Sequence, residues 1–416
     1  LDFAPLKNEQ EMSKLEITQL SDLFRSKLAV TSEHPCLGDP DTIQFIKNSK
    51  VLFINRGLPG SGKSTLSNRI RKVYQNTVIC AGDDYFMDEF GNYNFDRNKL
   101  HEAHLSAQNK AHKACQNGIS PVVADNTNIK FWEFNPYLSI AREFNYIVII
   151  IEPRTEHKFD IEKLYQLNKH NVPKETIKQK LKEFQVVVPI YFGWYLNEKD
   201  SLWLNKLAKD CLSEALDKCE SFKIDLSNIR SDIDPEKLFE YKNKQQLHCT
   251  AKFMGKNWTN NNSLKEYVTN PWVSENLGKA FWLEIVGFSV SKRSIAADIF
   301  LKQEQVGKLW GNDFNSNEQL EVLEFFKEDN NNSVLDTIEF ADRAHITIGI
   351  RAGEKSYKAG IDLVRIKLMK KLNELRGNKM RTVQTDNFEI IYLSDCLCYC
   401  KLNNSVKINS LFTGYY

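Results

Sequence analysis

The eight residues 57–64 restrict the possible folds of this chain more than any other part of its sequence. Their sequence, Gly-Leu-Pro-Gly-Ser-Gly-Lys-Ser, matches the pattern G-x-x-x-x-G-K-[ST]. The apolar run 51–54 precedes them as an expected buried strand, and the helix-like segment 65–73 follows. Glycines let backbone N–H groups curl around a phosphate, and the start of a helix adds positive potential. The pattern therefore predicts a phosphate-binding loop (P-loop) between a strand and a helix.

The apolar runs that follow the loop predict a doubly wound parallel sheet. These runs are residues 77–80, 121–124 and 146–151, and charged, helix-like segments separate them. Strands that alternate with helices form parallel sheets with helices on both faces. The alternation stops near Phe184, so a P-loop domain of the α/β class is expected at residues 46–185.

The rest of the chain predicts a second domain and an N-terminal extension. A chain of 416 residues is too long for one compact domain. Residues 186–416 mix helix-like and strand-like segments, which predicts an α+β fold. The strand-like runs are 280–290, 345–350 and 388–393. Residues 1–45 are expected to form a helical extension, because Leu20, Phe24 and Leu28 lie on one helical face.

The P-loop and two later segments contain the residues expected to hold a nucleotide. Lys63 would reach the β and γ phosphates, and the Ser64 hydroxyl would help to hold Mg²⁺. Carboxylates follow the next two strands, at the edge of a doubly wound sheet where ligands gather. The expected nucleotide-binding residues are Gly57, Gly60, Gly62, Lys63, Ser64, Thr65, Asp83, Asp84 and Asp125. The expected ligand is ATP with Mg²⁺.

The first domain resembles the polynucleotide-kinase-like branch of P-loop proteins. Besides the loop itself, segments 118–121 and 125–128 are similar to that branch. The resemblance implies phosphoryl transfer, for which active members use arginines in a lid helix. The corresponding segment here, 165–170, contains no arginine. Because losing such a cation lowers the rate of phosphoryl transfer by orders of magnitude, we expect nucleotide binding rather than kinase turnover.

Two segments of the second domain have the form His-x-Thr within strand-like sequence. They contain His248 with Thr250, and His345 with Thr347. Residues i and i+2 of a strand face the same way, so each histidine and its threonine project together. One histidine could act as base and the other as acid in a displacement at phosphorus, while the threonine hydroxyls hold phosphate oxygens. One such histidine alone would more often be structural; two copies favour a catalytic site that needs no metal.

The paired pattern resembles the two-histidine phosphoesterase superfamily, which implies a bilobal α+β fold. A P-loop domain ahead of such a domain is similar to the 2′,3′-cyclic nucleotide 3′-phosphodiesterase family. The segments with the closest local resemblance are 56–64, 189–194, 247–253, 343–349 and 411–416. This resemblance implies hydrolysis of 2′,3′-cyclic nucleotides to 2′-phosphates.

The family resemblance also implies a role for individual side chains. His345 would activate the attacking water and His248 would protonate the departing 3′ oxygen, although the two roles could be reversed. Thr250 and Thr347 would bind phosphate oxygens. The further substrate-binding residues that it implies are Arg343, Phe253 and Tyr191.

Three cysteines near the C-terminus are expected to be buried rather than to bind metal. Cys396, Cys398 and Cys400 alternate along the sequence, which places them on one face of a predicted strand. A structural zinc site would show C-x2-C spacing and a second pair of ligands.

The net charge of the chain and its terminal sequences indicate which partners and which cellular location to expect. The chain has 56 Lys and Arg against 54 Asp and Glu, so bulk charge does not require nucleic acid, and DNA sequence recognition is not expected. Neither a signal peptide nor an apolar run of about 18 residues is present, so we expect a cytoplasmic protein. Family members often carry a prenylated tail, whereas this chain ends at Tyr416 without a C-a-a-X box. Attachment to a membrane surface or to cytoskeleton through missing termini therefore stays open.

Two alternative functions remain at this point. The first is an RNA end-healing enzyme that combines 5′-kinase and phosphodiesterase activities. The second is a nucleotide-regulated scaffold for RNA or cytoskeleton that has lost catalysis. The missing lid arginines argue against the first, and two complete His-x-Thr segments argue against the second.

Overall fold

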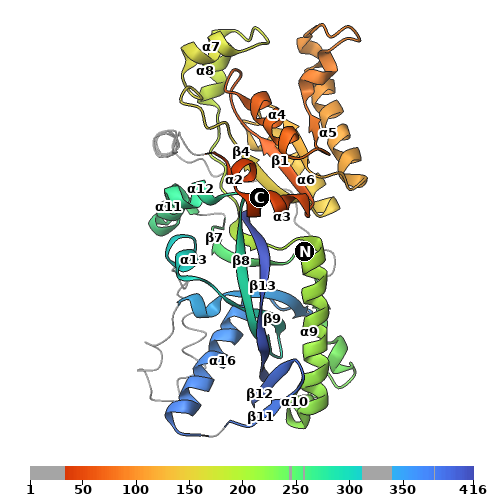
Figure 1. Cartoon of the computed structure of the whole chain (residues 1–416), viewed down its shortest axis with the longest axis vertical. Coiled ribbons are helices and arrows are strands. Elements are labelled where there is room, and N and C mark those ends of the chain that lie inside the picture. Colours follow the sequence, from red (N-terminus) through yellow and green to blue (C-terminus); the bar gives the residue numbers. More distant parts are fainter. Residues whose placement is uncertain (1–32, 243–245, 256–257, 312–339, 379) are drawn as a thin grey trace.

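The computed structural model of the protein describes residues 33–242, 246–255, 258–311, 340–378 and 380–416. They form two domains around two separate sheets, and the first domain lies above the second in Figure 1. The residues on which the predicted N-terminal helix depends, Leu20, Phe24 and Leu28, lie outside the described residues. Within the described ranges, no helix is both long and apolar enough to cross a membrane.

The first domain contains a parallel sheet in the order β2-β3-β1-β4, which confirms the predicted doubly wound fold. Its strands are β1 (Val51–Asn55), β2 (Val78–Cys80), β3 (Val122–Asp125) and β4 (Ile147–Ile151). Its helices after β1 are α4 (Lys63–Val73), η1 (Gly82–Phe86), η2 (Arg97–Lys99), α5 (Leu100–Gln116), α6 (Phe131–Phe144), α7 (Ile161–Leu167) and α8 (Lys174–Lys182). Phe53 packs against α4 on one face of the sheet, whereas Leu52 and Ile54 pack against α5 and α6 on the other. Burial on both faces explains why these strands are continuous apolar runs.

Two short helices, α2 (Pro35–Gly38) and α3 (Pro40–Lys47), precede this sheet. The Asp39 carboxylate begins α3 by accepting a hydrogen bond from the backbone N–H of Thr42 at 2.9 Å. Phe45 and Ile46 are buried in the same apolar cluster as β1 and α4. Helix α3 therefore crosses the predicted limit between residues 45 and 46. It packs against both domains, because the same cluster contains Ala280 and Leu411, and the Ala280 backbone N–H donates to the Thr42 hydroxyl at 2.9 Å.

The second domain is built on an antiparallel sheet in the order β11-β12-β13-β5-β7-β10-β9-β8, with β6 paired to β10, in agreement with the predicted α+β class. Its strands are β5 (Tyr191–Tyr195), β6 (Phe239–Tyr241), β7 (His248–Phe253), β8 (Lys279–Val290), β9 (Ser294–Phe300), β10 (His345–Arg351), β11 (Thr382–Gln384), β12 (Phe388–Ser394) and β13 (Leu397–Tyr415). Its helices are α9 (Glu198–Lys218), α10 (Glu220–Ser227), η3 (Pro235–Lys237), η4 (Trp258–Asn260), α11 (Asn262–Thr269), α12 (Pro271–Asn276), α13 (Gln303–Lys308), η5 (Phe340–Arg343) and α16 (Lys358–Leu375). Because β13 pairs with both β5 and β8, the strands from β13 through β8 form a closed ring of pairings.

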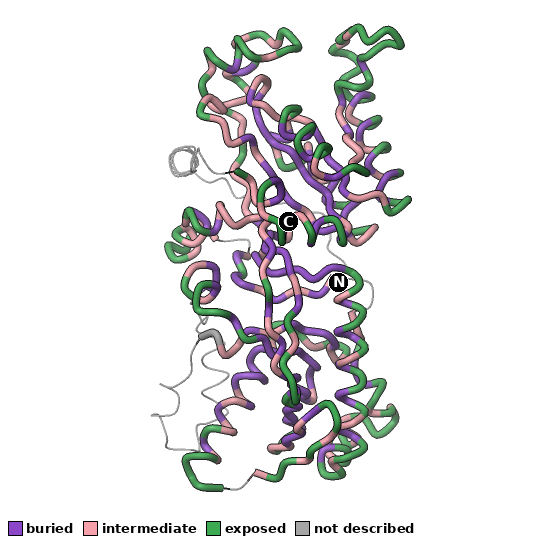
Figure 2. The backbone as a smooth tube through the Cα atoms, viewed as in Figure 1, coloured by how far each residue is buried: buried purple, intermediate pink, exposed green. Residues whose placement is uncertain are grey.

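Strand β13 runs lengthwise through the second domain and ends beside the first (Figure 1). A two-residue turn, Asp395 and Cys396, joins it to β12 with φ angles of 47° and 59°. The prediction that Cys396 lies on the strand is therefore wrong, because this tight hairpin needs a left-handed backbone at both turn positions. Cys398 and Cys400 lie on β13 and are fully buried. Figure 2 shows the inner strands of both sheets as the buried part of the molecule.

Candidate active site

The two His-x-Thr segments lie on neighbouring antiparallel strands, β7 and β10, as the sequence predicts. Cys249 of β7 pairs with Ile346 of β10, and both side chains are fully buried in the core. Residues on either side of this pair face away from the core, because side chains alternate along a strand. The antiparallel register then sets His248 opposite Thr347 and Thr250 opposite His345. One face of the sheet therefore carries both imidazoles and both hydroxyls, with opposed side chains roughly 5 Å apart at Cβ.

Each histidine is held by a backbone group two residues before it. His345 Nδ1 lies 2.7 Å from the carbonyl oxygen of Arg343. A carbonyl can only accept, so the neutral ring carries its proton on Nδ1 and leaves Nε2 able to take a proton. His248 makes the corresponding backbone hydrogen bond with Gln246. The two segments thus repeat the same local arrangement as well as the same sequence pattern.

Burial keeps both imidazoles neutral in the free protein. It lowers the pKa of His248 to about 3, and the positive charge of Lys242 acts in the same direction. It lowers the pKa of His345 to about 4, with further lowering by Arg343, Lys242 and Lys367. Desolvation disfavours a charged ring, and the surrounding cations add repulsion. An anionic ligand between these groups would reverse that repulsion.

The other predicted substrate-binding residues surround the two histidines in different ways. Thr347 Oγ1 donates to the carbonyl oxygen of Ser356 at 3.2 Å, which leaves its oxygen able to accept. Arg343 Nη2 donates to the carbonyl oxygen of Gly311 at 3.2 Å, and Phe253 is 64% exposed at the end of β7.

Tyr191 lies beside His248 rather than in open solvent. Its ring stacks on the imidazole with centroids 4.9 Å apart, and Tyr195 stacks at 5.1 Å. Tyr195 is also the strand partner of His248 in β5. The sequence analysis missed Tyr195, because an aromatic residue in a buried strand has no pattern that separates a packing role from a functional one.

The P-loop is shaped by its glycines. Gly62 begins α4 with a φ of 102°, and a Cβ there would meet nothing closer than 3.7 Å, which leaves the anion side of the loop open. At Gly60, by contrast, a Cβ would lie 2.3 Å from the carbonyl oxygen of Leu164, because α7 packs directly on the loop. Lys63 Nζ donates to the carbonyl oxygen of Leu58 at 3.0 Å, and burial lowers its pKa to about 8. Within the described ranges this half-buried ammonium forms no ion pair, which suits it to an anionic ligand.

The remaining residues fit a nucleotide with Mg²⁺. Asp125 ends β3 next to the P-loop, where Asn55 Nδ2 lies 3.3 Å from its Oδ1. Burial raises the pKa of Asp125, and hydrogen bonds from Ser67 and Ser64 oppose that rise. A hydroxyl and a carboxylate side by side at this edge are oxygen ligands of the kind that Mg²⁺ prefers. The hydroxyl of Ser61, a residue of the loop itself, is buried and has no partner in the described structure.

Asp83 and Asp84 are exposed on η1, which follows β2 at the same carboxyl end of the parallel strands. Asp84 forms an ion pair with Lys110 at 2.8 Å. Asp83 lies 3.3 Å from His170 Nε2 and 3.2 Å from the Tyr93 hydroxyl. His170 belongs to the segment expected to act as a lid, so the lid is in contact with the carboxylates although it has no arginine.

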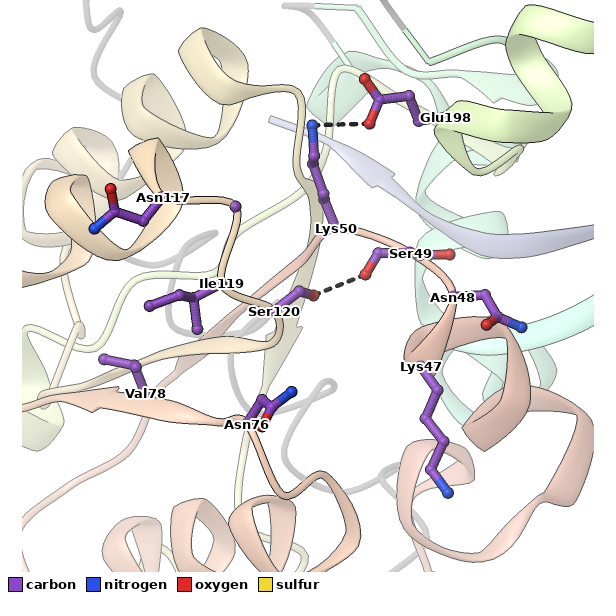
Figure 3. Close-up of a pocket in the computed structure, with 11 residues that line it drawn as sticks. Lys47, Asn48, Ser49, Lys50, Asn76, Val78, Asn117, Ile119, Ser120 and Glu198 are labelled. Carbon is purple, nitrogen blue, oxygen red and sulfur yellow. Dashed lines mark hydrogen bonds and ion pairs between the residues drawn. The ribbon is translucent and has the colours of Figure 1, made fainter.

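A cavity of about 660 Å³ (Figure 3) lies at the amino ends of the parallel strands, where Lys50, Val78 and Ser120 line it. The P-loop follows the carboxyl end of β1 instead. Lys50 points across it to Glu198 at 2.8 Å, and Ser120 contacts the Ser49 backbone (Figure 3). None of the residues predicted to bind a nucleotide or a cyclic phosphate lines this cavity. It is therefore separate from both candidate sites.

Comparison with known proteins identifies the family. The family profile described as 2′,3′-cyclic nucleotide 3′-phosphodiesterase (CNP or CNPase) matches residues 188–416, which is more than half of the chain. The chain belongs to this family. A profile described as AAA domain matches residues 52–187, so the family's phosphodiesterase region here follows a P-loop region. The predicted family is thus confirmed.

Individual relatives of the 2′,3′-cyclic nucleotide 3′-phosphodiesterase family extend over nearly the whole chain. The rat and mouse 2′,3′-cyclic-nucleotide 3′-phosphodiesterases are each 28% identical over 395 residues, covering 92% of this chain and 87% of theirs. Human NEDD4-binding protein 2 is 42% identical over 151 residues, which are 36% of this chain and 8% of that protein. A crystal structure of a fungal RNA kinase is 13% identical and covers 88% of this chain and 99% of its own, but its TM-score of 0.24 supports no structural argument.

Proposed function

We propose that the second domain hydrolyses 2′,3′-cyclic phosphates, on nucleotides or on RNA ends, to 2′-phosphates. The observation that supports this most is the register of β7 and β10, which sets two imidazoles and two hydroxyls on one face of the sheet. Membership of the 2′,3′-cyclic nucleotide 3′-phosphodiesterase family supports the same substrate class.

The proposed reaction is an in-line displacement at phosphorus. The oxygen of a water molecule bonds to phosphorus, and the proton of this water passes to Nε2 of His345. The bond between phosphorus and the 3′ oxygen breaks, and His248 donates its proton to that oxygen, which leaves a 2′-phosphate and a 3′-hydroxyl. His345 suits the role of base because its Nδ1 is committed to the Arg343 carbonyl. His248 would gain its proton together with the substrate, since a phosphate anion favours the charged ring.

Neighbouring side chains would bind and orient the phosphate. Thr250 and Thr347 would hold its non-bridging oxygens, and Arg343 would add positive charge at the edge of the site. Tyr191 would keep the ring of His248 in place by stacking, and the exposed Phe253 would contact the base. We propose that this reaction needs no metal ion, because the imidazole pair supplies both proton transfers.

The first domain is proposed to bind ATP with Mg²⁺ at the P-loop. Lys63 would contact the phosphates, and Ser64 with Asp125 would hold the metal ion. When bound, Mg²⁺ would supply positive charge that offsets the charge of the phosphates. Binding to RNA, to membrane or to cytoskeleton, and a cytoplasmic location, remain expectations from the sequence.

Hydrolysis of 2′,3′-cyclic AMP in EDTA tests the proposed function. The wild-type chain is compared with His248→Ala, His345→Ala and, as a control outside the site, Lys63→Met. We expect 2′-AMP as the product, with kcat lowered by at least about 10³-fold in either histidine variant and unchanged in the control. Turnover that survives either histidine substitution, or that requires a metal ion, would overturn the mechanism. Formation of 3′-AMP would show that the bond between phosphorus and the 2′ oxygen breaks, which contradicts the proposed mechanism.

A further inference from the structure

Lys242 lies beside the histidine pair, although its sequence position gave no reason to expect it there. It directly follows β6, which pairs with β10 along the same edge as β7. The Lys242 backbone N–H donates to the carbonyl oxygen of Ile348 at 3.0 Å, one residue beyond the position where His248 lies opposite Thr347. Strands β6 and β7 thus lie end to end along β10, and this brings Lys242 next to the active face.

The Lys242 ammonium lies close to Thr347, one of the residues predicted to bind the phosphate, and both contact Ser356. Its Nζ lies 3.5 Å from Ser356 Oγ, and the carbonyl oxygen of Ser356 accepts the Thr347 hydroxyl at 3.2 Å. Its positive charge lowers the pKa of His248 more than any other nearby charge does, and it also lowers the pKa of His345. The side chain is half-buried, and burial lowers its pKa to about 8.

The other cations near the pair are already engaged by protein groups. Arg343 donates to the Gly311 carbonyl and lies over the ring of Trp310. Lys367 forms an ion pair with Asp298 at 2.8 Å. Among the described residues, by contrast, no carboxylate forms an ion pair with Lys242. A half-buried cation that has no counter-charge in the described part of the chain, beside two neutral rings, is arranged for an anion that arrives from outside.

We propose that Lys242 is a further catalytic residue, whose ammonium binds a non-bridging oxygen of the cyclic phosphate and stabilises the charge that develops during attack. The inference rests on the proposed phosphodiesterase function and adds the fixed positive charge that the His-x-Thr segments lack. Two neutral imidazoles and two hydroxyls bring no net charge to an anionic substrate. Preorganised donors aimed at developing charge contribute strongly to catalysis where water is excluded.

Substitution of Lys242 provides the test, with 2′,3′-cyclic AMP as substrate in EDTA. We expect Lys242→Met to lower kcat/KM by about 10²- to 10³-fold, as for loss of one such donor, and Lys242→Arg to keep most of the activity. Lys237→Met, which removes an exposed lysine from η3 just before β6, is the matched control and should behave as wild type. Unchanged kcat/KM in Lys242→Met, or equal loss in folded Lys242→Arg, would overturn the proposal.

Two further measurements separate a catalytic from a structural role. Removing Lys242 should move the acid limb of the kcat/KM profile to higher pH, because a cation that lowers the pKa of both rings is lost. Among the described residues, Arg343 and Lys367 would still face His345, and His345 would still face His248. Calorimetric titration with 2′-AMP should give weaker binding to Lys242→Met than to Lys242→Arg. If the histidine variants are inactive but Lys242→Met is not, this inference alone fails; if the histidine variants stay active, the proposed function fails first.

Discussion

Titration of His248 and His345 in the free protein and with 2′-AMP examines the electrostatic basis of the site. Burial sets the pKa of these rings to about 3 and about 4, far below the value of about 6.5 for an exposed histidine. Both rings should therefore stay neutral when the pH is lowered to 5. A phosphate charge about 5 Å from a ring contributes about 3 kcal/mol at an effective dielectric constant of about 20, which raises its proton affinity roughly 100-fold. Product binding should thus bring at least one ring back toward ordinary titration.

Histidine-ring NMR between pH 4 and 8 measures this directly, and the two single alanine variants assign the signals among the eight histidines of the chain. In the free protein, His345 should show the tautomer with the proton on Nδ1, since that atom contacts the Arg343 carbonyl. The same rings in urea should titrate at the exposed value. If either ring of the folded, free protein titrates near pH 6.5, burial does not control the site. If 2′-AMP leaves both titrations unchanged, the phosphate does not lie beside the imidazoles.

Three other outcomes follow from the same contacts. Because both histidine pKa values lie below the unfolded value, the unfolded chain binds more protons and stability is lost as the pH falls. Chemical denaturation should show that the free energy of unfolding decreases by about 2 kcal/mol per histidine between pH 6.5 and 5. In His248→Gln the decrease should be smaller by the contribution of one histidine. Lys63→Met should abolish ATP binding measured by calorimetry while the phosphodiesterase kcat stays within about twofold of wild type. Lys367→Met should lower kcat about tenfold with little change in KM, because Lys367 Nζ donates to the Asp342 carbonyl at 2.8 Å and so fixes the backbone that orients His345; an unchanged kcat would show that this backbone needs no such support.

The sequence predicts both candidate sites because each depends on short-range geometry. The glycines of residues 57–64 adopt the positive φ angles that a tight loop requires, and the flanking strand and helix follow from apolar periodicity. In a His-x-Thr segment, the period of two of a strand already places both polar side chains on one face. The sequence pattern alone does not show that the two strands are neighbours. The pairing of Cys249 with Ile346 confirms that they are.

Residues that reach a site through sheet order are not predictable in this way. Lys242 and Tyr195 meet His248 only because β6 and β5 pair with β10 and β7, and no local pattern encodes those pairings. The position of α3 across the predicted limit at residue 45 has a related cause. Phe45 and Ile46 are buried where β1, α4 and the second-domain strand β8 meet, and no local pattern encodes that meeting.

The contact between the two domains bears on whether the first regulates the second. The end of β13 joins them, since the Thr413 hydroxyl donates to the carbonyl oxygen of Val148 in β4, while Tyr415 stacks on Tyr191, which stacks on His248. Spatial continuity of this kind is not coupling, because coupling requires an element with two arrangements that a ligand of one site favours differently. Tyr195 and Leu411 are instead buried in one apolar cluster with β1 and β4, which favours a single packing. The first domain is therefore expected to support the phosphodiesterase through this shared core, so that disrupting the core lowers activity whereas removing the nucleotide does not.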